Sequence, residues 1–88
     1  MGELILKYKK QLKKVPKDKR RVFHKLIALC FDLINLGATA ETIHTYTDGH
    51  AISEAIKNHK KHTLTTLKKW VTKLSFQKIK LEKHWAIK

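Results

Sequence analysis

The chain has 88 residues, which suits one small domain spanning 1–88 and leaves little room to enclose an active site. Hydrophobic residues make up 42% of it, which argues against disorder, and its few glycines and single proline favour helices over many strands. The net charge of +13, from 20 Lys and Arg against 7 Asp and Glu, predicts a polyanionic partner, with nucleic acid ahead of an anionic membrane surface.

The charges are unevenly distributed along the chain. Residues 1–25 contain ten Lys or Arg and two acids, and residues 57–88 contain ten and one. Residues 26–56 contain four acids and no Lys or Arg. An apolar, mildly acidic middle therefore separates two basic flanks, which predicts a core that presents two cationic surfaces.

The first predicted element is an amphipathic helix from Glu3 to Val15, which Pro16 ends. The helix is predicted by apolar residues at helical spacing with lysines around them. The apolar stripe consists of Ile5, Tyr8, Leu12 and Val15.

The second predicted helix begins at Lys17 or Asp18 and runs to Leu36, with Gly37 directly after its end. It is apolar on nearly all sides, so we expect it to be central in the core or partly covered by a second subunit. Its Cys30 is the single cysteine of the chain, which predicts a core residue and a reducing, cytoplasmic location.

Four cations crowd the start of this second helix, where the helix dipole disfavours positive charge. One interpretation is a solvated cluster. The functional interpretation is a phosphate clamp beside the free helix N–H groups, formed by Lys17, Lys19, Arg20 and Arg21.

Three shorter elements are predicted next. Thr39 can cap a helix over Ala40–Thr47, and Asp48-Gly49 is typical of a turn. A fourth helix is predicted over Ala51–Asn58, followed by a polar break. Thr63 caps the fifth helix, whose buried stripe should be Leu64, Leu67, Trp70, Val71 and Leu74.

The tail, residues 76–88, permits two interpretations. Its apolar residues share odd positions, as in a strand, yet some pairs also suit a helix. We favour an extended segment, either a short wing or a strand that pairs in a dimer. The predicted fold is thus mainly α, a small bundle of four to five helices with a short C-terminal β segment.

The segment AISEAIKNHKKHTLTTLKKWVTKL, residues 51–74, resembles the helix-turn-helix of bacterial DNA-binding proteins. The resemblance covers about a quarter of the chain. It implies that the first helix packs through Ala51 and Ala55, and that the second enters the major groove. Its connection, Asn58–His62, is longer than the family's turn and lacks glycine. The implied contact residues are Thr63, Thr65, Thr66, Lys68, Lys69, Thr72 and Lys73, with Lys60 and Lys61 beside them.

The leading functional hypothesis is a small, homodimeric DNA-binding protein, either a transcriptional regulator or a plasmid or phage accessory factor. The alternative is an RNA-binding or RNA-chaperone module, and a third is a module for membrane surfaces or protein interactions. We expect no enzyme activity, small-molecule substrate or cofactor, because no nucleophile elbow, phosphate loop or carboxylate pair is present. We also expect no metal, because the six histidines form no closed ligand set.

Overall fold

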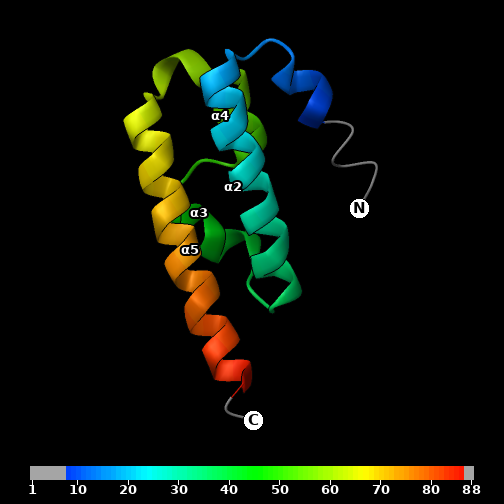
Figure 1. Ribbon diagram of the computed structural model, residues 1–88, viewed down its shortest axis with the longest axis vertical. Helices are drawn as coiled ribbons and strands as arrows, with labels where there is room; N and C mark the ends of the chain where they lie inside the picture. Colours follow the sequence, from blue (N-terminus) through cyan, green and yellow to red (C-terminus); the bar gives the residue numbers. More distant parts are fainter. Residues whose placement is uncertain (1–7, 87–88) are drawn as a thin grey trace.

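The computed structural model describes residues 8–86 of the chain (Figure 1). These residues are mainly helical, and no strand occurs among them, so the predicted α class is confirmed. A short helical segment at residues 8–12 comes first. It is followed by α2 (Lys17–Asn35), α3 (Ala40–Tyr46), α4 (Ile52–Lys57), the 3-10 turn η1 (His59–Lys61) and α5 (Leu64–Ala86).

The first predicted helix ends earlier than its apolar stripe indicates. Helical structure stops at Leu12, and the chain then turns, with the Val15 N–H donating to the Leu12 carbonyl over 3.0 Å. Leu12 and Val15 are both buried, as the stripe predicts, but Val15 reaches the core from the turn. The predicted start at Glu3 lies outside the described residues.

The end of α2 is fixed by Gly37, as predicted. Its φ of +100° lies in the left-handed region, which costs glycine little. The Gly37 N–H donates to the Ile34 carbonyl, and the Ala38 N–H donates to the Leu33 carbonyl. This pair of bonds is a Schellman motif, which satisfies carbonyls that the helix end leaves free.

The corner between α3 and α4 also follows its local sequence. The Thr39 side chain accepts a hydrogen bond of 3.2 Å from the Thr42 N–H, which confirms the predicted cap of α3. The predicted turn has positive φ at both Asp48 (+53°) and Gly49 (+81°). It redirects the chain from α3, which contacts α5 and α2, to α4, which contacts α2.

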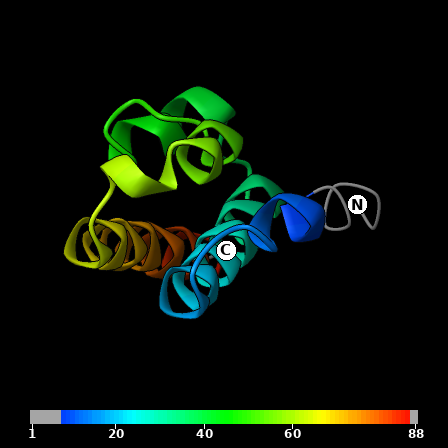
Figure 2. The same ribbon diagram turned by 90° about the horizontal axis from the view of Figure 1, so that it is seen from above.

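The two long helices lie side by side and begin at the same end of the molecule (Figure 1). Viewed from above, α3 and α4 lie together on one side of this pair (Figure 2). α3 packs against both α5 and α2, whereas α4 packs against α2. The two short helices thus cover one side of the long pair.

The core lies between these layers. Phe23 and Leu26 of α2 meet Trp70 of α5, and all three are fully buried. Each such side chain contributes about 1.5–3 kcal/mol relative to exposure. In the shorter helices, Ile43 of α3 and Ile56 of α4 are also buried.

The extended interpretation of the tail is wrong for residues 76–86, which continue α5 as a helix. No glycine or proline interrupts the chain after Leu74, so nothing local ends the helix. Leu81 continues the buried stripe and packs against the core, and the Lys78 ammonium pairs with the Asp32 carboxylate of α2 over 2.9 Å. Residues 87–88 lie outside the described residues.

Candidate nucleic-acid interface

The two basic flanks of the sequence meet at one end of the fold. Lys19 Nζ, in the first turn of α2, donates a hydrogen bond of 2.8 Å to the backbone carbonyl of His59. Because η1 leads into α5, this contact places the first turns of α2 and α5 together (Figure 1). The positive ends of both helix dipoles therefore lie at the same end. The exposed cations there are Lys17, Arg21, Lys60 and Lys61.

The first half of α5 presents a cationic outer face. Lys68 and Lys69 are exposed, on the opposite side of the helix from Leu67 and Trp70, which are buried. Neither lysine's ammonium group forms an ion pair or hydrogen bond with another described residue. No acid occurs in α5 before Glu82, so this face has no internal compensation for its charge.

The predicted contact threonines differ in whether their hydroxyl groups are already hydrogen-bonded within the fold. Thr63 caps α5, since its Oγ1 accepts from the Thr66 N–H over 3.2 Å and also lies 3.0 Å from the Thr66 hydroxyl. The Thr72 hydroxyl donates to the Lys68 carbonyl over 3.1 Å. Thr65 is exposed, and its hydroxyl has no partner among the described residues. Of this set, Thr65 is best placed to offer both a hydroxyl and a methyl group to a ligand.

Two of the cations predicted to clamp phosphate serve the fold instead. Arg20 Nε donates to the Leu12 carbonyl over 3.0 Å, and its Nη2 donates to the Lys13 carbonyl over 3.2 Å and the Val15 carbonyl over 3.0 Å. Its guanidinium thereby satisfies the free carbonyls after the helical segment at 8–12. Lys19 is likewise engaged, by the carbonyl of His59. Lys73, predicted as exposed, is half-buried.

A polar and aromatic cluster holds the start of α5 to the α3–α4 corner. Trp70 Nε1 donates to Asp48 Oδ2 over 2.8 Å, and the His62 ring centroid lies 5.1 Å from those of both His50 and Trp70. Burial lowers the pKa of His62, and the neighbouring His50 and Lys19 lower it further. The sequence pattern missed this pairing, although a buried tryptophan N–H generally requires an acceptor.

Neither a metal centre nor a reactive thiol emerges from the geometry. The described residues include no group of three or more His, Cys, Asp or Glu side chains that could hold a metal ion. Burial raises the pKa of the Cys30 thiol to about 11. The thiol is therefore protonated at neutral pH and is a poor nucleophile.

The link that departs from the helix-turn-helix pattern is a turn of 3-10 helix. η1 occupies His59–Lys61, between α4 and α5. Since α4 packs mainly on α2, the segment 51–74 is supported by the rest of the domain more than by contact between its own two helices. The resemblance of this segment to the family stays a prediction.

Neither a protein-family model nor a curated protein nor a solved structure matches this chain. Within residues 8–86, every helix is too short or too polar to cross a membrane. The proposal for function therefore depends on charge, exposure and geometry.

Proposed function

We propose that this protein binds nucleic acid, with duplex DNA as the favoured ligand. The binding surface, the basic face, consists of Lys17, Arg21, Lys60, Lys61, Lys68 and Lys69. The observation that carries the proposal is the junction of α2 and η1 by Lys19 and His59, which gathers cations from both ends of the sequence. These six side chains are exposed and none is paired with a described acid, so they remain available to phosphates.

The first half of α5 is the element we expect to enter the major groove. The groove of B-DNA is about 12 Å wide and admits one helix. Lys68 and Lys69 would then reach phosphates or guanine edges, and the methyl group of Thr65 would contact thymine. Lys17 and Arg21 of the neighbouring helix would contact the flanking backbone, which sets position without reading sequence.

The test is fluorescence anisotropy with a labelled 20-base-pair duplex. Lys68→Glu and Lys69→Glu should each weaken binding at least ten-fold, because each replaces an attraction to phosphate by a repulsion. Lys83→Glu is the matched control, since it changes the charge equally on an exposed site of the same helix. If all three variants lost the same amount of affinity, binding would depend on net charge alone. That outcome would contradict a specific role for Lys68 and Lys69.

Salt dependence tests the number of contacts. About six phosphate contacts predict that log K falls with log salt concentration at a slope near −5. An affinity that does not change with salt would contradict any nucleic-acid ligand. Structured RNA and single-stranded DNA are included as competitors, and stronger competition by structured RNA would favour the RNA-binding alternative.

The proposed biological role is that of a transcriptional regulator or a DNA-binding accessory factor, acting as a homodimer. Dimers place two equivalent helices on one duplex and increase the number of contacts that read sequence. Sequence preference is tested by selection from a random duplex library. Enrichment of a two-fold symmetric site would support this role.

A further inference from the structure

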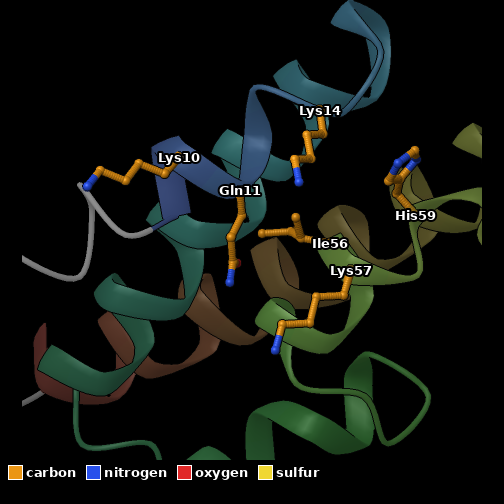
Figure 3. Close-up of a pocket in the computed structure, with 6 residues that line it drawn as sticks. All are labelled: Lys10, Gln11, Lys14, Ile56, Lys57 and His59. Carbon is orange, nitrogen blue, oxygen red and sulfur yellow. The ribbon is translucent and has the colours of Figure 1, made fainter.

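A second basic feature lies away from the outer face of α5. It is an open pocket of about 410 Å³ between the helical segment at 8–12 and the α4–η1 segment (Figure 3). We call it the lysine pocket. Its lining residues are Lys10, Gln11, Lys14, Ile56, Lys57 and His59.

The walls of the lysine pocket carry positive charge without compensation. Lys10, Lys14 and Lys57 come from two separate segments, and none of their ammonium groups forms an ion pair or hydrogen bond with another described residue. No acid is among the described residues that line the pocket. In Figure 3, Gln11 and Lys14 extend toward the α4 segment, while Lys10 extends away from the other lining residues. Such an arrangement attracts an anion of more than one charge.

Two buried polar atoms of the pocket residues have no hydrogen-bond partner among the described residues. They are Gln11 Oε1 and His59 Nδ1. A buried polar atom without a hydrogen bond is unfavourable, so the Gln11 amide gains a bond if it turns toward a ligand that supplies a donor. The His59 backbone is meanwhile held by Lys19, so its ring has a fixed anchor. The pocket thus offers hydrogen-bonding groups in addition to charge.

We propose that the lysine pocket binds a small phosphate ester with hydroxyl or amino donors, of the size of a nucleoside monophosphate. The phosphate group pairs with the ammonium groups of Lys14 and Lys57, and Lys10 rotates toward it. A ligand donor pairs with Gln11 Oε1, and the apolar surface of Ile56 contacts the remainder of the ligand. The volume of the pocket falls in the range of small-molecule sites. The lysines of this site are not those of the proposed nucleic-acid interface, although His59 of η1 lies beside both.

Isothermal titration of the full chain with adenosine monophosphate tests the proposal. We expect saturable one-to-one binding, and at least ten-fold weaker binding in Lys14→Gln and in Lys57→Gln, because each loses a charge-assisted bond. Lys83→Gln, which removes an exposed lysine elsewhere, should keep the affinity. Adenosine, which lacks the phosphate, should bind at least ten-fold more weakly than the monophosphate.

Gln11→Met tests the hydrogen-bonding part, because it keeps the side-chain length and removes the amide. This variant should bind the monophosphate more weakly but bind inorganic phosphate with unchanged affinity. Absence of saturable binding, or equal binding by the Lys14→Gln, Lys57→Gln and Lys83→Gln variants, would overturn the inference. The duplex titration separates the two proposals, since Lys14→Gln should preserve most DNA affinity and Lys68→Glu should preserve nucleotide affinity.

Discussion

The indole of Trp70 and the carboxylate of Asp48 form a hydrogen bond of 2.8 Å across 22 residues of chain. Trp70 is fully buried, so its N–H depends on this acceptor. Asp48 itself adopts a left-handed backbone conformation, with φ of +53°, at the turn between α3 and α4. The bond therefore fastens that turn to α5 and sets the position of the proposed recognition helix.

Asp48→Ala should lower the free energy of unfolding by about 1–3 kcal/mol, because the buried indole N–H loses its acceptor. Asp48→Asn is the matched control, since asparagine keeps an acceptor oxygen and tolerates positive φ. Urea denaturation followed by circular dichroism measures both. An equal loss in the two variants would show that the hydrogen bond contributes little and that another property of the aspartate matters.

The lowered pKa of His62 predicts that stability depends on pH. Because the unfolded chain holds this proton more readily than the folded one, stability is greatest above the ordinary histidine pKa, near 6.5. It falls as the pH decreases through that value and through the lower folded pKa. The protonated ring would also face Lys19 and Lys61, which disfavour its charge.

We therefore expect the melting temperature to fall between pH 7.5 and pH 5, and to fall less in His62→Gln. Differential scanning fluorimetry across this range measures the difference between the two proteins. The comparison isolates His62, because the other histidines are shared. A parallel decline in both proteins would assign the pH dependence to other groups.

Local chemistry made much of the fold predictable. Gly37 ends α2, Thr39 and Thr63 cap their helices, and the Asp48-Gly49 turn occurs where the sequence indicates it. Each of these features depends on one or two neighbouring residues. The periodic apolar stripe likewise identified the core residues Leu67, Trp70 and Leu74 of α5, because helical spacing determines which side chains share a face.

Features that depend on distant residues were not predictable from these patterns. The alternating apolar residues of the tail predict an extended segment, but contacts of Leu81 and Lys78 with other elements favour a continued helix. In the same way, the charge pattern predicts Arg20 as a phosphate contact, although its guanidinium donates to three carbonyls of an earlier segment. Sequence spacing alone contained no information on these partners.

Arg20 and Arg21 provide a test that separates stability from binding. Arg20→Gln should lower the free energy of unfolding by about 1–3 kcal/mol, because three backbone carbonyls lose a charged donor. Arg21→Gln removes the same charge from an exposed site and should leave stability unchanged within about 0.5 kcal/mol. Urea denaturation measures the stability of both variants.

In the duplex titration, Arg21→Gln should weaken binding and reduce the salt slope by about one. The Arg20→Gln variant, measured at a urea concentration low enough for it to stay folded, should bind the duplex nearly as well as the unchanged protein. The reverse order of affinities would mean that the guanidinium of Arg20 contacts phosphate despite its backbone partners.

The outer face of α5 is cationic before Thr72 and carries exposed apolar side chains after it. This apolar part is relevant to the proposed dimer. Phe76 is 60% exposed and Ile79 is 49% exposed, although both are large and apolar. We expect these two side chains to contact a second copy of the chain, because exposed apolar surface favours association.

The double variant Phe76→Ser, Ile79→Ser should then be monomeric at concentrations where the unchanged protein is dimeric. Sedimentation equilibrium measures the difference, and Ile34→Ser, which alters a side chain 50% exposed on α2, is the matched control. A protein that is monomeric at every concentration, or a dimer that the double variant retains, would contradict this assignment.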